Sequence, residues 1–216
     1  MKKSRISEKT MKLVLGGIMI ALSAVLSLIK VFQLPYGGSI TLCSMLPIMI
    51  YAYKYGVKWG VFAGFAYSIT QLILDAAAIR GFTLLSALGV MVFDFFVAFS
   101  VLGLASIFKN RFKKNTVAFS LGAAFAMLLR YLSHVISGMI FFGSYAEWYF
   151  SQEGMAIGGV ILEKFSGYGL ALIYSLIYNG SYMLPELLIT LIAGYLLMKL
   201  TEKTLFPSNK LLKRSV

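Results

Sequence analysis

Three polar side chains of this sequence stand inside long apolar stretches, where burial of a polar group is costly. Asp94 lies between Phe93 and Phe95, His134 is the single histidine, and Asn179 lies in the last apolar run. A charged group at the centre of a membrane span costs about 2.5–3.5 kcal/mol on insertion scales, so such residues are candidates for function. Structural explanations also exist, such as pairing with a buried arginine or joining two helices. We favour function for Asp94, whereas His134 and Asn179, each taken alone, fit a structural role better.

An aromatic cluster at residues 141–150 suggests what a site here would bind. Most of the cluster is typical of an aromatic belt at the outer membrane interface. Phe141 and Phe142 lie about two helical turns beyond His134, however, so one of them could line a pocket that also holds Asp94. A single carboxylate among aromatic rings favours a cation, because the faces of the rings also attract positive charge. Nearby amide and tyrosine groups would select a heterocycle over a bare ion. These residues predict a small, flat, positively charged ligand that is taken from outside.

Two further charges lie in or near the apolar runs. Arg130 stands one turn before His134 on the same helix face, since residues four apart are neighbours on a helix. It could be a structural counter-ion to Asp94 or to Glu186, and we assign it to no site. Glu186 follows Pro185, which frees a backbone carbonyl and can kink the helix.

Motifs for common enzymatic chemistry are absent from the sequence. It contains neither the G-x-x-x-x-G-K-[ST] loop of ATPases nor the H-E-x-x-H of zinc proteases. Ser133 or Ser137 could act with His134, but no G-x-S-x-G elbow is present. The single cysteine, Cys43, excludes a disulfide framework and a cysteine-rich metal site. We expect no enzyme, no metal and no cofactor; an intramembrane enzyme that uses His134 is the alternative from a different class.

The elements that must position these residues are apolar runs long enough to cross a membrane. Hydrophobic residues make up 59% of the 216-residue chain and charged residues 13%, whereas soluble domains have about 45–50% and about 25%. A membrane helix needs about 20 mostly apolar residues. We therefore expect an all-α integral membrane protein that forms a single domain over residues 1–216, with six transmembrane helices. The approximate spans are 13–32, 40–53, 59–74, 82–108, 116–142 and 168–200.

The net charge of +12 would by itself suggest nucleic-acid binding. Its distribution argues otherwise, because sixteen of the twenty basic residues fall before the first span, between the second and third, between the fourth and fifth, or in the tail that starts with Lys199 at the end of the sixth. Lys and Arg are enriched in cytoplasmic loops, so both termini are predicted to be cytoplasmic. There they can meet anionic head groups of the bilayer, and no nucleic-acid partner is expected.

Four segments of the chain match the pattern of a known family. They are residues 35–40 (PYGGSI), 94–99 (DFFVAF), 128–144 (LLRYLSHVISGMIFFGS) and 173–185 (IYSLIYNGSYMLP). They resemble the thiamine-specific substrate-binding (S) component of energy-coupling factor (ECF) transporters, the ThiT or YuaJ family. The resemblance covers the whole chain and implies the ECF S-component fold in the bacterial plasma membrane. It also implies capture of extracellular thiamine.

The resemblance further implies which residues bind thiamine. Asp94 stands at the family's acidic position. His134 and Phe142 stand at its two ring-contacting positions, and Tyr174 and Asn179 stand at its two hydrogen-bonding positions. Further expected lining residues are Gly38, Phe95, Phe141 and Tyr178. Some relatives have Glu and Trp in place of Asp94 and Phe142. The acid is therefore one methylene shorter here, and the aromatic face attracts a cation less strongly.

Transport partners also follow from the resemblance. The family docks on a membrane-embedded T component through small residues of the first helix, and Gly17 and Ala21 have the spacing that permits close helix approach. Two cytoplasmic ATPases supply the energy, and the S component topples in the membrane to release its vitamin. The sequence thus predicts a thiamine-binding S component; an S component for another vitamin or a thiamine precursor is the alternative within this class.

Overall fold

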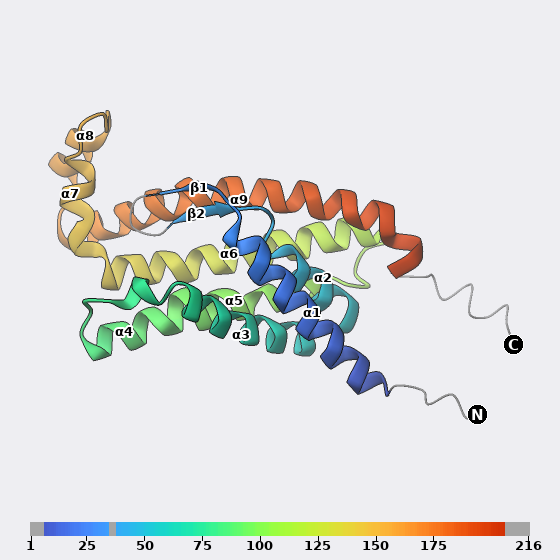
Figure 1. The fold of residues 1–216 in the computed structure, drawn as a ribbon. Helices are drawn as coiled ribbons and strands as arrows, with labels where there is room; N and C mark the ends of the chain where they lie inside the picture. The colour runs from blue at the N-terminus through green and yellow to red at the C-terminus, as the bar shows by residue number, and fades with distance from the viewer. Residues whose placement is uncertain (1–6, 35–37, 206–216) are drawn as a thin grey trace, which may run out of the picture.

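The chain folds into an elongated helical bundle with a small β-hairpin laid across it (Figure 1). The computed structural model describes residues 7–34 and 38–205, so predictions that rest on residues 35–37 or on the basic chain ends lie outside the described residues. The long helices are α1 (Glu8–Leu28), α3 (Val57–Leu74), α6 (Asn115–Phe141) and α9 (Gly167–Leu205). The remaining elements are β1 (Lys30–Gln33), β2 (Ser39–Thr41), α2 (Leu46–Tyr55), η2 (Ala76–Ile79), α4 (Leu84–Val90), η3 (Met91–Val97), α5 (Ala98–Ser100), η4 (Val101–Ser106), η5 (Gly143–Tyr145), α7 (Ala146–Phe150) and α8 (Gly158–Lys164).

The ends of the bundle have the relation that the predicted topology requires. The start of α1 and the end of α9 lie at the same end of the bundle, and α7 and α8 lie at the opposite end (Figure 1). We refer to the first as the cytoplasmic end and to the second as the outer end, following the distribution of basic residues.

Small residues on one face of α1 allow this helix to pack closely. Gly16, Ser23 and Ser27 are its buried residues and lie along one stripe of the helix. The hydroxyl of Tyr67 in α3 donates to the carbonyl of Ser23 at 3.3 Å, and the amide of Gln71 donates to the hydroxyl of Ser27 at 2.8 Å. Polar contacts of this kind join membrane helices that have no hydrophobic drive to associate.

The segment between α1 and α2 corrects two predicted boundaries. The apolar run 13–32 predicts a helix to residue 32, but α1 ends at Leu28 and residues 30–33 form strand β1. The run 40–53 predicts a second helix from residue 40, but α2 begins at Leu46, after β2 has paired antiparallel with β1. Short apolar runs do not distinguish a strand from a helix, which is why the hairpin was missed.

Helix α2 also corrects the expectation of six full spans. It has ten residues, about 15 Å of helix, which is about half of the hydrocarbon thickness. All residues from Leu46 to Tyr53 are buried, so protein rather than lipid surrounds the helix. Gly56 joins α2 directly to α3 with a φ of 91°, a conformation that favours glycine. Within residues 7–34 and 38–205, five helical segments are long and apolar enough to cross a membrane.

The fourth apolar run forms one rod whose winding changes along its length. Helix α4 passes into π-helical η3, and a short α5 then leads into the 3₁₀-helical η4. Asp94 lies in the π segment, and such wide turns occur frequently at functional sites. The hydroxyl of Ser133 in α6 donates to the carbonyl of Phe93 at 2.6 Å, which ties the π segment to its neighbour.

The cytoplasmic half of the bundle is densely packed. Its largest fully buried side chains include Tyr53, Leu102, Phe119 and Met198, from α2, η4, α6 and α9. Glycine permits close backbone approach here, because a methyl group at Gly103 would collide with the backbone of α3. The main hydrophobic cluster thus fills this half, and it extends to the cavity wall through Val90, Phe95 and Phe99.

Candidate ligand-binding site

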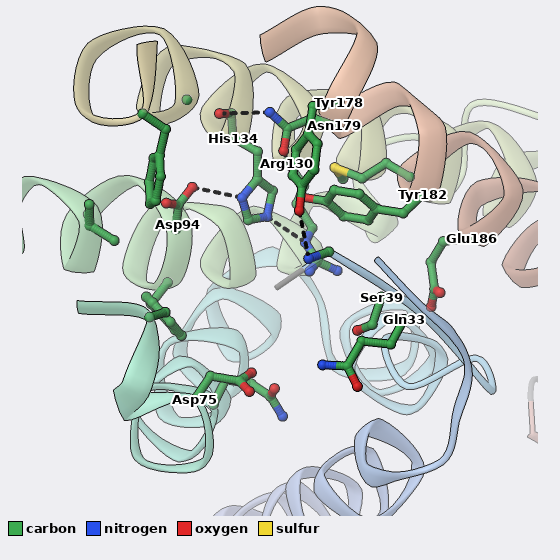
Figure 2. A pocket seen from close by; sticks show the side chains of 18 of the residues that line it. Gln33, Ser39, Asp75, Asp94, Arg130, His134, Tyr178, Asn179, Tyr182 and Glu186 are labelled. Carbon is green, nitrogen blue, oxygen red and sulfur yellow. Dashed lines mark hydrogen bonds and ion pairs between the residues drawn. The ribbon is translucent and has the colours of Figure 1, made fainter. Parts of the chain in front are cut away.

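A cavity of about 550 Å³ lies in the outer half of the bundle (Figure 2). Its walls come from the outer ends of α1 and α3, the π segment η3, helices α6, α7 and α9, and the hairpin. The volume lies within the range of about 300–1,000 Å³ that is usual for small-molecule sites. The predicted site residues that line it are Asp94, His134, Phe142, Tyr174, Asn179, Gly38, Phe95 and Tyr178.

Phe141 is the predicted lining residue that the structure places elsewhere. It is not among the residues that line the cavity, and its ring packs against Gly89 of α4. Phe142, the C-cap residue that follows α6, lines the cavity instead.

Asp94 is held on the cavity wall by two donors from α6. His134 Nδ1 lies 2.8 Å from Asp94 Oδ1, and the hydroxyl of Ser137 donates to Asp94 Oδ2 at 2.7 Å. An ionised carboxylate offers about four acceptor positions, so acceptor capacity remains on both oxygens. The carboxylate is therefore fixed in direction and is still able to receive donors from a ligand.

Arg130 is not the carboxylate counter-ion that its sequence position suggested. Among the described residues, no carboxylate oxygen lies within 4.0 Å of its guanidinium. Its Nε instead donates to His134 Nε2 at 3.4 Å, and its Nη1 donates to the thioether of Met45. The guanidinium also lies 4.5 Å from the centroid of the Phe99 ring, a cation–π contact.

Asn179 is engaged on both sides of its amide. Its Nδ2 donates to the carbonyl of Ser175 at 2.9 Å and to the carbonyl of His134 at 3.3 Å, while its Oδ1 accepts from the hydroxyl of Tyr182 at 2.7 Å. The residue thus joins α9 to α6 and also faces the cavity (Figure 2). The structural and the binding explanations of Asn179 are compatible.

Aromatic rings form the outer wall of the cavity. The rings of Tyr174 and Tyr178 stack at 5.7 Å, and the ring of Phe142 meets that of Phe82 edge to face at 5.2 Å. Trp148 of α7 lines the same space. A cationic heterocycle entering this space would meet π faces on one side and Asp94 on the other.

The hairpin is attached to α9 by a carboxylate that the sequence did not assign to the site. Glu186 is 2% exposed, and its two oxygens accept from the backbone N–H of Thr41 at 2.6 Å and from the hydroxyl of Thr41 at 2.7 Å. The hydroxyl of Tyr178 accepts from the backbone N–H of Gly38 at 3.3 Å. The hairpin thereby forms one wall of the cavity.

Several lining residues escaped sequence reasoning. Tyr182 follows Asn179 by one helical turn, so the spacing rule for helices could have identified it. Trp148 belongs to the aromatic cluster at residues 141–150, most of which is typical of an interfacial belt. Thr41 and Gln71 carried no such signal, because they lie on other elements.

The serines near His134 are not arranged for hydrolysis. Ser133 donates to the carbonyl of Phe93, and Ser137 donates to Asp94. The hydrogen bonds of His134 are made to Asp94 and Arg130 instead, so no described contact activates a serine nucleophile. Among the described residues, no group of three or more His, Cys, Asp or Glu is placed to hold a metal ion.

The predicted docking residues lie on the open face of α1. Gly17 and Ala21 are both exposed, and nothing lies within 4 Å of the position that a Cβ atom at Gly17 would take. Gly16, by contrast, faces the ring of Tyr51 in α2.

Comparisons with known proteins agree with this architecture. Residues 13–206 match a family described as thiamine transporter protein. The thiamine transporter ThiT of Bacillus subtilis strain 168 is 30% identical over 216 aligned residues, which cover 94% of this chain and 98% of that protein. A solved structure of ThiT from Listeria monocytogenes covers 93% of this chain and 100% of its own, with a TM-score of 0.67 at 22% identity. That likeness supports the fold alone, and with it the predicted all-α membrane class is confirmed. The family is one of transporters rather than enzymes, and this chain belongs to it as a multi-pass protein of the cell membrane.

Proposed function

We propose that this protein is the thiamine-binding S component of an ECF-type transporter, which captures extracellular thiamine and delivers it to the cytoplasm. The observation that carries the proposal is the carboxylate of Asp94, which two donors fix on the wall of an aromatic cavity. The family to which the chain belongs supports the substrate, since it is a family of thiamine transporters.

The chemistry of thiamine fits the cavity. Its thiazolium ring is a permanent cation, which suits Asp94 and the stacked tyrosines. Its aminopyrimidine offers N–H donors and ring nitrogen acceptors, for which the Asp94 carboxylate, the Asn179 amide and the hydroxyl of Tyr174 are partners. We assign these three residues, together with His134 and Phe142, to thiamine binding.

Direct binding tests this assignment. Thiamine should bind the purified protein in an isothermal titration. The Asp94→Asn variant keeps the shape of the side chain and removes its charge. It should weaken thiamine binding by about a hundredfold or more, which is the loss expected for a desolvated hydrogen bond to a charged group. Asp75→Asn is the matched control: Asp75 also lines the cavity, but it is exposed at the end of α3. Equal affinity in Asp94→Asn and the unmodified protein would remove the carboxylate from the mechanism.

A second vitamin or a thiamine precursor is the alternative ligand. Tryptophan fluorescence can compare such ligands, because Trp148 lines the cavity whereas Trp59 lies near Lys12 at the cytoplasmic end. In a Trp59→Phe background the remaining signal reports on the cavity alone. Mass spectrometry of the small molecule that co-purifies with the protein would identify the ligand without a prior choice; recovery of another vitamin would contradict the thiamine assignment.

The partners of transport are a membrane-embedded T component and two cytoplasmic ATPases. Helix α1 supports this part of the proposal, because only 17% of the residues in its 18-residue apolar stretch are buried. This is the lowest fraction among the membrane-capable segments of the described chain. We expect Gly17→Trp to abolish uptake in cells that contain the partner proteins while thiamine binding is retained. Leu188→Trp is the control, since it places the same indole on an exposed position of α9. Thiamine uptake by vesicles that contain this protein alone would instead indicate an ion-coupled carrier.

A further inference from the structure

Arg130 makes an unusual set of contacts for a cation inside a membrane protein. It lies about 22 Å along α6 from the first residue of that helix, and no carboxylate oxygen of the described residues lies within 4.0 Å of its guanidinium. Its Nε faces the imidazole of His134, its Nη1 faces the sulfur of Met45, and its plane faces the ring of Phe99. The strongest acceptor that it contacts is therefore a histidine nitrogen.

The direction of this contact determines where the proton of His134 lies. A guanidinium carries only donors and cannot accept a hydrogen bond. The 3.4 Å contact from Arg130 Nε is a hydrogen bond only when His134 Nε2 carries a lone pair. In a neutral imidazole the proton then lies on the other nitrogen, Nδ1, which is 2.8 Å from Asp94 Oδ1. Arginine, histidine and aspartate thus form a directed chain of hydrogen bonds (Figure 2).

This chain limits what each side chain can offer to a ligand. Both ring nitrogens of His134 are used within the protein, so the imidazole presents its face and carbon edge to the cavity rather than an N–H group. Asp94 accepts from His134 and from Ser137 and donates to neither. The carboxylate therefore faces the cavity as an acceptor of fixed direction.

We propose that Arg130 is a positioning residue that fixes the Nδ1–H tautomer of His134 and, through it, the orientation of the Asp94 carboxylate. The expected effect of Arg130 on ligand affinity rests on the proposed thiamine binding, whereas the assignment of the His134 tautomer does not. Other ionisable side chains of the cavity near this chain are Glu186 and Tyr182 of α9 and Tyr67 of α3, and no described hydrogen bond joins any of them to His134.

The single histidine makes the tautomer directly measurable. Protein labelled with ¹⁵N-histidine and freed of any tag gives one imidazole in a long-range ¹H–¹⁵N spectrum, without resonance assignment. We expect one species without ligand, with the proton on Nδ1. In Arg130→Met a signal from a protonated Nε2 should appear, because nothing then requires a lone pair there. In Arg130→Gln, whose amide can donate to Nε2, the original spectrum should return.

Two outcomes overturn the inference. One is a proton on Nε2 in the unmodified protein, a result that needs no variant to fold. The other is an unchanged spectrum in Arg130→Met, which would show that Asp94 alone fixes the ring.

Thiamine titration separates this inference from the proposed function. We expect roughly ten- to a hundredfold weaker binding in Arg130→Met, partial recovery in Arg130→Gln, and no change in Arg111→Met, an exposed cation in the loop before α6. An unmodified protein that does not bind thiamine, yet shows the expected tautomer, would contradict the proposed function and leave the positioning role standing. Weaker binding in Arg130→Met with an unchanged tautomer would overturn the positioning role alone.

Discussion

The long helices α3, α6 and α9 run through both halves of this bundle, and the two halves are held together differently. In the cytoplasmic half, large apolar side chains such as Tyr53, Leu102 and Phe119 are fully buried against one another. In the outer half, the helices surround a cavity of about 550 Å³, and hydrogen-bonded polar pairs join its walls. The difference indicates that dense packing in one half allows the other half to remain open.

The polar pairs of the outer half link neighbouring elements around the cavity. Asp94 and Ser137 join η3 to α6, Asn179 joins α9 to α6, and Glu186 joins α9 to the hairpin. A typical hydrogen bond of this kind contributes about 0.5–1.5 kcal/mol, and one to a charged group contributes about 1.5–3 kcal/mol. Substitutions in the cytoplasmic half should therefore have large effects on the stability of the whole protein, whereas those in the outer half should have smaller, local effects.

The largest effect is expected in the cytoplasmic half. Gly103→Val should lower the free energy of unfolding by about 3 kcal/mol or more, because the added side chain meets the backbone of Gly60 and Val61 rather than a flexible side-chain end. Thermal unfolding in detergent measures the loss. Gly17→Val is the control, because nothing lies within 4 Å of the added Cβ atom. Equal stability of the two variants would contradict the view that this half is tightly packed.

A smaller, local effect is expected at the hairpin. Thr41→Val keeps the shape of the side chain but leaves Glu186 Oε1 without its hydroxyl donor, at a cost of about 1–3 kcal/mol for a buried charged acceptor. Hydrogen exchange of the amides in β1 and β2 should accelerate, and thiamine affinity should fall, while the exchange of α2 should not change.

Thr190→Val is the matched control for this substitution. Thr190 is fully buried in α9, and its hydroxyl has no hydrogen-bond partner among the described residues. Its replacement by valine should therefore be neutral or slightly stabilising. If Thr190→Val accelerates exchange in the hairpin as much as Thr41→Val does, the contact with Glu186 does not anchor the hairpin.

Sequence reasoning succeeded where the signal is local. Long apolar runs marked α3, α6 and α9, and the polar residues within them marked the cavity wall. The i, i+4 spacing also placed Arg130 beside His134, although it did not identify the hydrogen bond between them.

The missing parts depend on contacts that are distant in the chain. The bond between Thr41 and Glu186 spans 145 residues, and no local pattern at either position indicates it. The hairpin is apolar enough to look like the end of a span, and the π turn at Asp94 has no sequence signature that we recognised. The short, buried α2 looked like a membrane span because a helix buried in protein and a helix in lipid are both apolar on all sides. The sequence pattern therefore does not distinguish them.

The smallest effect is expected on the aromatic wall, and it has the opposite sign. Phe142→Trp should strengthen thiamine binding by roughly two- to tenfold, because indole presents a more electron-rich face to a cation. Phe142→Leu should weaken binding by a similar factor, and both shifts should shrink for an uncharged analogue of the ligand. The outer half has open space beside Phe142, which contacts Phe82 edge to face at 5.2 Å. A larger ring should therefore fit there without the loss of stability expected for Gly103→Val. A lower melting temperature in Phe142→Trp would mean that the outer wall is as tightly packed as the cytoplasmic core.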